Sequence, residues 1–503
     1  MALSHFFLVV RAEFRIFFVS LHRNSKVIKV MLIGRERERQ RLLDAYKSRN
    51  SEFVAVYGRR RVGKTYLVRE VFANKTAFAH SGLANADKRS QLRAWVDSLK
   101  EYGMDIPAIP KTWIDAFALL KELVRKSKSR KKVLFIDEMP WMDTQHSGFV
   151  TALEHFWNGW ASGRKDVLLI VCGSATSWII NKVIKNHGGL HNRVTVRIYV
   201  RPFTLYECEK YVQGNGLSLS RRQILECYMV MGGVPFYWTF LRKGKSMAQN
   251  IDEMFFAPEG SLCGEFEELY ASLFKKTDVY VAIVTVLATK QAGMTRKELL
   301  KEAKLNNNGN LSKALADLEN CGFIRKYSPL GKKERGAVYQ LIDFYTLFYF
   351  RFLSDNRNLD PHFWTLSQET PQYYAWSGLA FERVCFEHVE QIKMALGISG
   401  VLSNVYSWRS KADATLEKGA QIDMLIDRKD QVITLCEMKF SKRRFAIDAG
   451  YDEVLQNKVA RFRAETGTRK AIHIALVTSM GLVQNEYVDD VQNVLEMNDL
   501  FNI

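Results

Sequence analysis

The sequence has no paired metal-ligand motif and no long apolar run, and each absence excludes a class of protein. Its seven cysteines are scattered without a CxxC pair, and its ten histidines form no HExxH pair. We therefore expect neither a zinc site nor a disulfide framework, and a reducing cytoplasm as the location. The longest uncharged apolar run, residues 167–180, is shorter than the roughly 20 residues that a membrane-spanning helix needs. With 9 prolines and 30 glycines, no collagen-like or low-complexity stretch is present.

The first 30 residues differ from the rest of the chain. The first ten resemble the apolar region of a signal peptide, but Arg11, Glu13 and Arg15 interrupt it and no small-residue cleavage site follows. Met31 begins MLIGRERERQRLL, which is a natural start for a globular domain. We therefore expect residues 1–30 to be an extension from a mis-assigned start codon, with a basic amphipathic membrane anchor as the alternative.

Positive charge is what the sequence has in excess. Lysine and arginine total 73 against 54 acidic residues, which gives a net charge of +19. This favours a polyanionic partner, with DNA or RNA as the first candidate. The 47% hydrophobic and 25% charged residues are ordinary for a globular protein, and 503 residues correspond to about three domains.

A phosphate-binding loop is the most specific motif. The apolar run at residues 53–57 has the composition of a buried parallel strand and leads directly into GRRRVGKT, after which residues 66–72 have a helical pattern. This is GxxxxGK[ST] in its strand–loop–helix setting. The residues expected to bind a nucleotide are Gly58, Arg59, Arg60, Arg61, Val62, Gly63, Lys64 and Thr65. The glycines let backbone N–H groups face phosphate, the lysine supplies charge, and the threonine supplies a hydroxyl for Mg²⁺.

A second strand ends in two carboxylates. Residues 133–136, VLFI, precede Asp137 and Glu138, which is the Walker B pattern of NTPases. We expect Asp137 to hold Mg²⁺ through water and Glu138 to polarise the attacking water as general base. An acidic turn after a strand would be the simpler interpretation for an isolated motif, but the P-loop favours the catalytic one.

A polar residue after a third buried run, residues 167–172, is expected to reach the γ-phosphate or the attacking water. Ser174 is the first candidate and Thr176 the second, although serine or threonine after a strand is also a common helix N-cap. Arg193 follows this strand at a place where an arginine can act on the γ-phosphate, with an ordinary surface arginine as the alternative. Acting across a subunit boundary would require a homo-oligomer.

The order of the strands narrows the class of NTPase. A strand candidate at residues 76–80 lies between the P-loop and the paired carboxylates, with room for two helices as well. This order is typical of NTPases with an inserted strand and a catalytic glutamate. No NKxD guanine motif is present, which argues against the small GTPases.

Residues 278–349 predict three helices followed by a hairpin, the pattern of a winged helix-turn-helix. Thr295 and Glu298 have the spacing of a capping box, and residues 310–320 place apolar side chains on one stripe. The basic residues around the predicted wing are Arg325, Lys326, Lys332, Lys333 and Arg335. They favour contacts with DNA phosphates, whereas a protein–protein module is the alternative.

The carboxyl-terminal part has the pattern of a PD-(D/E)XK nuclease core. A helix contains Glu382, a strand contains Asp423, and the next strand ends in Glu437-Met-Lys439. Asp423 and Glu437 can hold one or two divalent ions. Lys439 points to the same side of its strand as Glu437, because side chains alternate, and can orient or deprotonate the attacking water.

Two further observations bear on this core. Gln456 and Lys458, on a following helical segment, are candidate phosphate contacts. Ile422 stands before Asp423 in place of the eponymous proline. The intact metal ligands favour catalysis, while a fold retained as an inactive binding module is the alternative.

Taken together, the motifs resemble those of the archaeal-type AAA+/STAND ATPases. The segments that carry the resemblance are GRERE, GRRRVGKT, LFIDEMPWM, GSATSW, GGLHNR, PFTLYE and MGGVP. The resemblance implies that Gly34, Arg35 and Glu36 lie beside the nucleotide base and that residues 233–235 belong to a lid that senses the nucleotide. It also implies an ATP-driven switch, with ATP and Mg²⁺ as cofactors, more than a processive motor.

The expected architecture is a multidomain α/β protein. A P-loop ATPase core with a parallel sheet covers residues 31–205, and a helical lid covers residues 206–270. A winged helix covers residues 275–352, and a restriction-endonuclease-like domain covers residues 370–480. The leading hypothesis is an ATP-controlled, metal-dependent DNA nuclease with a second divalent ion, in defence against or maintenance of mobile elements. The alternative is an ATP-gated DNA- or protein-binding regulator with an inactive nuclease-fold domain.

Overall fold

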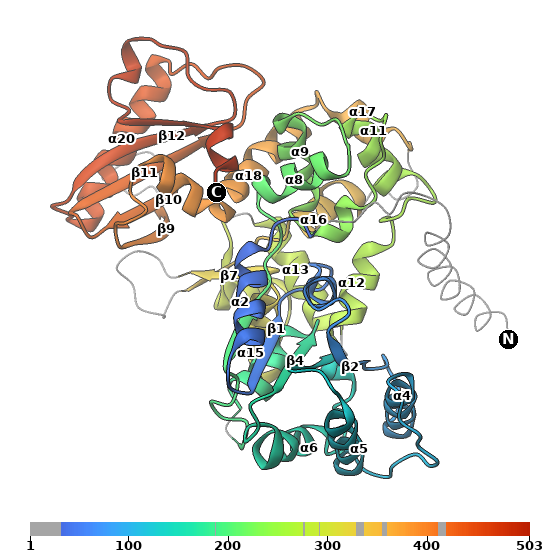
Figure 1. The fold of residues 1–503 in the computed structure, drawn as a ribbon. Coiled ribbons are helices and arrows are strands. Elements are labelled where there is room, and N and C mark those ends of the chain that lie inside the picture. The colour runs from blue at the N-terminus through green and yellow to red at the C-terminus, as the bar shows by residue number, and fades with distance from the viewer. Residues whose placement is uncertain are drawn as a thin grey trace. The chain divides into compact units, whose positions relative to one another are not determined.

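The computed structural model describes residues 32–503 except 187, 275–276, 291, 328–336, 355–359 and 411–418. The extension expected at residues 1–30 therefore lies outside the described residues. By its internal contacts the chain divides into Met1–Ile33 and Gly34–Ile503, and the account below concerns the second unit. Its described residues contain three sheets (Figure 1).

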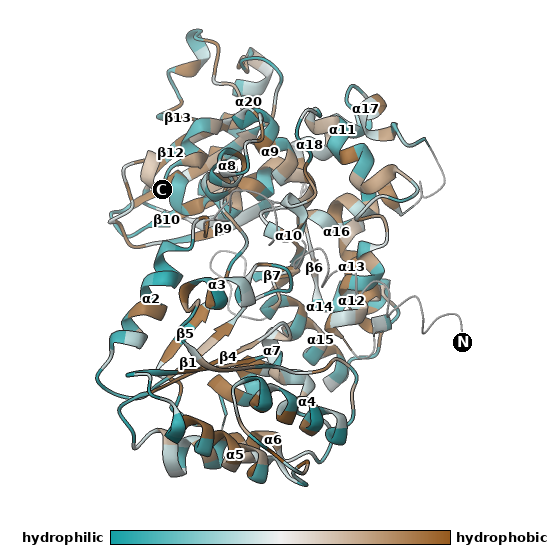
Figure 2. Ribbon diagram, turned by 45° about the vertical axis from the view of Figure 1, so that its right-hand side comes forward, coloured by the Kyte–Doolittle hydropathy of each residue, from teal (hydrophilic) through white to brown (hydrophobic). Residues whose placement is uncertain are grey.

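A parallel sheet with the strand order β2-β3-β4-β1-β5 organises the amino-terminal part, as the sequence predicts for a P-loop core. Its strands are β1 (Glu52–Tyr57), β2 (Thr76–Ser81), β3 (Lys132–Asp137), β4 (Val167–Gly173) and β5 (Val196–Tyr199). Every residue of β4 is buried, because helices cover both faces of a central parallel strand. In Figure 2 the strands β1 and β4 are strongly hydrophobic, whereas the helices around them alternate between polar and apolar residues.

Helices with one apolar face cover this sheet. They are α2 (Glu36–Lys47), α3 (Lys64–Val71), α4 (Lys88–Glu101), α5 (Trp113–Lys126), α6 (Phe149–Phe156) and the short α7 (Thr176–Trp178). Thr112 starts α5 by accepting a hydrogen bond from the backbone N–H of Asp115. The core beneath α4, α5 and α6 centres on Trp95, Trp113 and Phe117, which pack against one another. Burial of such large rings is a main source of stability for this layer.

Five short helices follow in the region predicted as a lid. They are α8 (Leu205–Gly214), α9 (Arg221–Met231), α10 (Pro235–Trp238), α11 (Met247–Ile251) and α12 (Glu265–Leu273). Capping boxes begin α8, α9 and α11 at Thr204, Ser220 and Ser246. Gly232 ends α9 with a φ of 62° and a ψ of −169°, a positive-φ conformation that glycine adopts at little cost.

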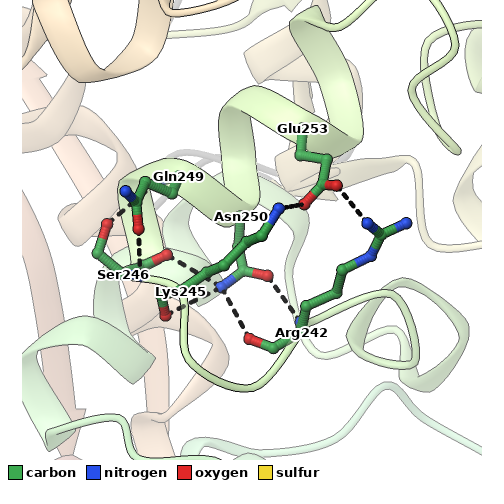
Figure 3. A network of polar contacts seen from close by, with 6 residues as sticks. All are labelled: Arg242, Lys245, Ser246, Gln249, Asn250 and Glu253. Atoms are coloured by element: carbon green, nitrogen blue, oxygen red, sulfur yellow. Dashed lines mark hydrogen bonds and ion pairs between the residues drawn. The ribbon is translucent and has the colours of Figure 1, made fainter.

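The loop before α11 is held by one buried side chain, Asn250 (Figure 3). Its Oδ1 accepts from the Arg242 N–H at 2.7 Å, and its Nδ2 donates to the carbonyl oxygen of Ser246 at 2.9 Å. Asn250 is 2% exposed. Removing it deprives the Arg242 N–H of its acceptor and several carbonyl oxygens of the loop of a donor, a combined loss of about 1–3 kcal/mol.

We therefore expect Asn250→Ala to speed amide hydrogen exchange across residues 241–251 by roughly tenfold to a hundredfold. Lys245→Ala is the matched control, because its ammonium pairs with Glu253 at 2.6 Å on the exposed surface. Such a pair contributes about 0–1 kcal/mol, so exchange should change little. Equal exchange rates in the Asn250→Ala variant and the wild type would contradict this role for Asn250.

Three helices and a small antiparallel sheet come next. The helices are α13 (Thr277–Thr289), α14 (Arg296–Glu302) and α15 (Gly309–Asn320), and the strands β6 (Met294–Thr295), β7 (Ile324–Tyr327) and β8 (Val338–Leu341) pair in the order β6-β8-β7. The capping box predicted at Thr295 and Glu298 is confirmed. Lys332, Lys333 and Arg335 of the predicted wing lie outside the described residues.

A mixed sheet organises the carboxyl-terminal part. Its strands β9 (Ser403–Ser410), β10 (Ala420–Arg428), β11 (Val432–Lys439), β12 (Ala471–Thr478) and β13 (Asn493–Glu496) lie in the order β13-β12-β11-β10-β9. β10 is antiparallel to β9 and β11, whereas β11, β12 and β13 are parallel. The remaining helices are α16 (Phe344–Phe348), α17 (Phe363–Ser367), α18 (Pro371–Glu387), α19 (Val389–Ala395) and α20 (Ala449–Thr466). Among the described residues, no helix has the length and apolar character to cross a bilayer.

Candidate functional site

The P-loop has the predicted geometry of strand, loop and helix. Gly58 follows β1 with a φ of 142°, and Gly63 precedes α3 with a φ of 85°. A side chain at Gly58 would collide with the carbonyl oxygen of Val200, so only glycine allows this close approach. No side chain caps the first turn of α3, which leaves its N–H groups able to bind an anion at the positive end of the helix.

The two motifs predicted to act on phosphate and Mg²⁺ meet at the carboxyl edge of the sheet. Thr65 donates from its hydroxyl to Asp137 Oδ2 at 2.7 Å. Lys64 lies over the same loop and donates to the carbonyl oxygens of Gly58 and Arg59 at 3.0 and 2.7 Å. A hydroxyl and a carboxylate at this separation are oxygen donors of the kind that Mg²⁺ takes, so these residues fit the ion.

Glu138 is positioned by the neighbouring strand. Its Oε2 accepts hydrogen bonds from Ser174 Oγ at 2.9 Å and from the Ser174 N–H at 3.3 Å. β4 lies beside β3 and parallel to it, so Ser174, which follows β4, comes close to Glu138, which follows β3. Glu138 has a φ of 48°, an uncommon conformation for a residue with a side chain. Gly82 packs against its carbonyl oxygen, so the backbone here is tightly enclosed.

We expect Ser174→Ala to lower the rate of ATP hydrolysis by about tenfold, with nucleotide binding retained. The variant removes one of the two donors that orient Glu138, and a single hydrogen bond to a charged group is worth about 1.5–3 kcal/mol. Steady-state phosphate release measures the effect. Ser177→Ala is the matched control, because the Ser177 hydroxyl accepts from Asn320 instead. A wild-type rate in Ser174→Ala would show that Glu138 does not depend on Ser174.

Thr176 differs from Ser174 in its burial, and Arg193 differs from it in its place in the sheet. Thr176 is buried, with 0% of its side chain exposed, at the start of α7. Arg193 is exposed and precedes β5. Two residues later, the Thr195 N–H donates to the carbonyl oxygen of Phe53, near the amino end of β1. β5 is parallel to β1, so Arg193 lies at the amino edge of the sheet. The P-loop lies at the opposite, carboxyl edge.

Two P-loop arginines extend away from the loop. The Arg59 guanidinium forms an ion pair with Asp343 and stacks on the Phe323 ring at 5.0 Å. The Arg61 guanidinium forms an ion pair with Glu265 and stacks on the ring of Phe236 at 4.3 Å. Their side chains therefore contact other parts of the chain, although their backbone groups remain in the loop.

The GRE segment lies against the P-loop through Arg35, and its predicted place beside the nucleotide base stays a prediction. Arg35 Nη2 donates to the Val62 carbonyl at 3.2 Å, and its guanidinium stacks on the Phe203 ring at 4.8 Å. The Arg35 N–H donates to Glu207, which also closes the capping box of α8. The start of α2, the P-loop and the start of α8 are thus joined by one buried arginine.

The carboxyl-terminal candidates lie near one another in the structure. Asp423 on β10 accepts from the Met438 N–H of β11 at 3.1 Å. Lys439 lies over the ring of Tyr451 at 4.5 Å. Glu382 projects from α18, a helix that packs against β11. The charges of Asp423, Glu437 and Lys439 all act on Glu382, so α18 and the adjacent strands β10 and β11 bring these side chains close together.

The electrostatics of these carboxylates are those of a crowded, buried acidic cluster. Burial and the neighbouring Asp423 raise the pKa of Glu382 to about 8 and that of Glu437 to about 7. Burial also raises the pKa of Asp423. Glu437 is 2% exposed, and its Oε1 has no hydrogen-bond partner among the described residues. A cation at this position would offset the cost of burying these carboxylates and the repulsion that Asp423 exerts on Glu382 and Glu437, and so lower these pKa values.

Several predicted phosphate contacts are engaged elsewhere. Lys458 forms an ion pair with Glu437 at 2.6 Å, and Gln456 donates to Asp490 at 2.8 Å. Arg325 donates to Gln340 at 2.7 Å and stacks on the Phe386 ring at 4.1 Å. A nucleic acid would therefore have to compete with these protein partners, which sequence spacing does not reveal. The role of these residues as phosphate contacts stays a prediction.

Four residues of these sites were not found from the sequence. Asp343 and Glu265 belong to no sequence motif. Their importance follows only from their ion pairs with P-loop arginines that are distant in the sequence. Tyr451 contacts Lys439 with its ring, and its hydroxyl donates to Glu437 at 3.4 Å. Gly82 directly follows β2, and a glycine at the end of a strand beside Walker B is the one signal that could have identified it.

Comparison with known proteins supports the nucleotide site at the P-loop. Residues 32–241 match the model of an ATPase domain predominantly from Archaea. The chain is 21% identical over 415 residues to an uncharacterized protein of Methanocaldococcus jannaschii, covering 82% of this chain and 88% of that protein.

Solved structures with lower similarity include a Walker-type ATPase of Pyrococcus abyssi, with a TM-score of 0.49, 17% identity, and coverage of 64% of this chain and 96% of that one. The ORC2 protein of Aeropyrum pernix has a TM-score of 0.38 and 13% identity, covering 63% and 93%. The domain match and the geometry of the P-loop together identify this chain as an ATPase with an archaeal-type P-loop domain.

Proposed function

We propose that this ATPase is a switch that controls a metal-dependent DNA nuclease in its carboxyl-terminal domain. The observation that carries the proposal is the convergence of Glu382, Asp423 and Glu437 with Lys439 on α18, β10 and β11. Two or more carboxylates beside a lysine supply metal ligands and a group that activates water. The sheet order β13-β12-β11-β10-β9, with α18 before it and α20 within it, supports a restriction-endonuclease-like fold.

The ATPase half acts through four side chains. Mg²⁺ bound to the nucleotide neutralises phosphate charge and would be held by Thr65 and, through water, Asp137. Lys64 supplies positive charge for the β- and γ-phosphates. Glu138, held by Ser174, orients the attacking water and accepts its proton.

The described contacts provide a route from the ATPase to the second site. Arg222 on α9 donates to the carbonyl oxygen of Ser441 at 2.8 Å and stacks on the Phe440 ring at 4.0 Å. Phe440 directly follows Lys439. α18, which carries Glu382, contacts both α9 and β11. A movement of the helical region in response to nucleotide would therefore act on two residues of the acidic cluster.

The donor set of the acidic cluster fits a divalent cation. Asp423 and Glu437 are oxygen ligands, and the buried Glu437 Oε1 without a hydrogen-bond partner in the described part of the chain is an acceptor that a cation would satisfy. Lys439 would orient the water that attacks phosphate. DNA is the proposed substrate because the chain carries a net charge of +19. A winged helix at α13, α14 and α15 is the proposed second DNA contact.

One observation favours the alternative of an inactive nuclease fold. Lys458 already neutralises Glu437, and no group of three or more acidic, histidine or cysteine side chains in the described residues is arranged to hold a metal. A cluster stabilised by its own lysine has a structural role without metal. In that case the protein would be an ATP-gated regulator that binds DNA or a protein.

Calorimetric titration with Mn²⁺, without nucleotide, tests the proposal on the full chain. We expect one or two sites in the wild type and their loss in Asp423→Asn. Asp427→Asn is the matched control, because Asp427 lies on the same strand but pairs with Lys470 at 2.5 Å. Absence of Mn²⁺ binding in the wild type, or equal binding in Asp423→Asn, would favour the regulator instead.

A further inference from the structure

The P-loop of this chain contains three consecutive arginines, of which two do not direct their side chains to the phosphate-binding positions. Lys64 and Thr65 account for the side-chain contacts expected with phosphate and Mg²⁺. Arg59 and Arg61 instead contact residues 343 and 265, which are more than 200 positions away in the sequence. A loop that binds nucleotide is thereby tied to two other parts of the molecule.

The first connection joins the loop to the segment between β8 and α16. Arg59 is 5% exposed and Asp343 is 4% exposed. Burial alone would lower the pKa of Arg59, but the Asp343 carboxylate, together with Tyr237 and Tyr270 nearby, raises the pKa above its ordinary value. Arg59 Nε and Nη2 have no hydrogen-bond partner among the described residues, so Asp343 is the main compensation for this buried charge.

Asp343 also caps a helix, so the connection from the P-loop ends at the start of α16. Its Oδ2 accepts from the Thr346 N–H at 3.0 Å and from the Thr346 hydroxyl at 2.6 Å, which caps the start of α16. Oδ1 pairs with Arg59. The same carboxylate thus fixes the start of a helix and the position of the P-loop.

The second connection joins the loop to α12 and α10. Glu265, the first residue of α12, is 3% exposed and accepts a hydrogen bond from the Tyr237 hydroxyl at 2.6 Å. Arg61 also approaches Glu268 of α12 at 3.5 Å. The Phe236 N–H donates to the Arg61 carbonyl at 3.4 Å, so both the backbone and the side chain of Arg61 contact this region.

We propose that Arg59 and Arg61 are the positioning residues that transmit nucleotide occupancy from the P-loop to α16 and α12. The P-loop backbone must take one conformation to surround the β-phosphate, and each arginine fixes that backbone to a buried carboxylate. When the loop changes on nucleotide binding or release, the two ion pairs move the starts of both helices. This inference needs only the ATPase and is independent of the nuclease-like domain.

Hydrogen exchange on the full chain with and without ADP measures the transmission directly. In the wild type, ADP is expected to slow exchange in residues 338–348 and 261–273, although neither segment belongs to the phosphate-binding motifs. In Asp343→Asn the first of these effects should disappear, while the asparagine, itself a good N-cap, still caps α16. Release of a fluorescent mant-ADP should be about tenfold faster, because a buried arginine without its partner destabilises the closed arrangement.

Asp87→Asn is the matched control. Asp87 caps α4 by accepting from the Ser90 N–H at 2.8 Å. The variant therefore makes the same Asp-to-Asn substitution at a helix start that has no buried arginine ion pair. Both readouts should stay at wild-type values. This comparison separates loss of the ion pair from loss of helix capping.

The double variant Arg59→Gln/Asp343→Asn keeps the test valid if the single variant does not fold, because it removes both buried charges together. It is expected to fold, to bind ADP and to lack the ADP effect on residues 338–348. An ADP effect of wild-type size in either variant would overturn the proposal. So would a mant-ADP release rate within twofold of the wild type in both variants.

Discussion

Glu138→Gln is expected to bind ATP with wild-type affinity and to hydrolyse it at least about a hundredfold more slowly. The amide has the shape of the carboxylate and can still accept from the hydroxyl and N–H of Ser174, so the local geometry is kept. It cannot accept a proton from the attacking water, and general-base catalysis is worth about 10²–10⁴-fold. Binding of a fluorescent ATP analogue and steady-state phosphate release measure the two properties separately.

Glu122→Gln is the control for this experiment, because Glu122 is an exposed residue of α5 on the same domain. It should hydrolyse ATP at the wild-type rate. A Glu138→Gln protein with wild-type turnover would show that another residue is the general base. A variant that no longer binds ATP would show that Glu138 holds the nucleotide instead of acting on water.

Lys439→Ala is expected to reduce metal-dependent DNA cleavage by at least about a hundredfold while Mn²⁺ binding is retained. Lys439 and Lys458 both lie near Glu437. Lys458 forms the ion pair with Glu437, so Lys439 is the candidate for orienting the attacking water. Without it the attacking water loses its orienting group, a contribution of about 10²–10⁴-fold. Cleavage of a linear DNA in the presence of ATP and Mg²⁺ or Mn²⁺ gives the rate.

Lys442→Ala controls for loss of a positive charge near the same strand. Lys442 lies three residues further on and pairs with Glu369 at 3.0 Å on the surface. Its removal should leave the cleavage rate within about twofold, since such exposed pairs contribute little. Cleavage at the wild-type rate in Lys439→Ala would rule out the proposed catalytic role, and parallel loss of Mn²⁺ binding would indicate a structural one.

Local motifs were predictable because their function requires adjacent residues. Each of these motifs occupies a few consecutive residues: the P-loop, the Walker B strand and the capping box at Thr295. Their strand–loop–helix contexts follow from hydrophobic patterning. The pairing of Ser174 with Glu138 was also predictable in outline, since the ends of neighbouring parallel strands meet at one edge of the sheet.

Long-range partners were not predictable, because no local pattern encodes them. Nothing near Asp343 indicates that it neutralises an arginine of the P-loop, and Lys458 looked like a free phosphate contact until its ion pair with Glu437 was visible. Arg193 is the opposite case, because sequence order predicted a place that the fold of its own chain does not give it, while action across a subunit boundary stays a prediction. Its position after β4 in sequence suggested the phosphate site, but the parallel pairing of β5 with β1 puts it at the opposite edge.

The proposed control of the nuclease-like site by ATP is tested most directly by one cleavage assay. Wild type and Lys64→Ala would be compared on linear and supercoiled DNA, with Mg²⁺ or Mn²⁺, each with and without ATP. We expect the wild type to cleave only when a divalent metal and ATP are both present, and Lys64→Ala to cleave in neither case. Cleavage by Lys64→Ala at the wild-type rate, independent of ATP, would contradict the account.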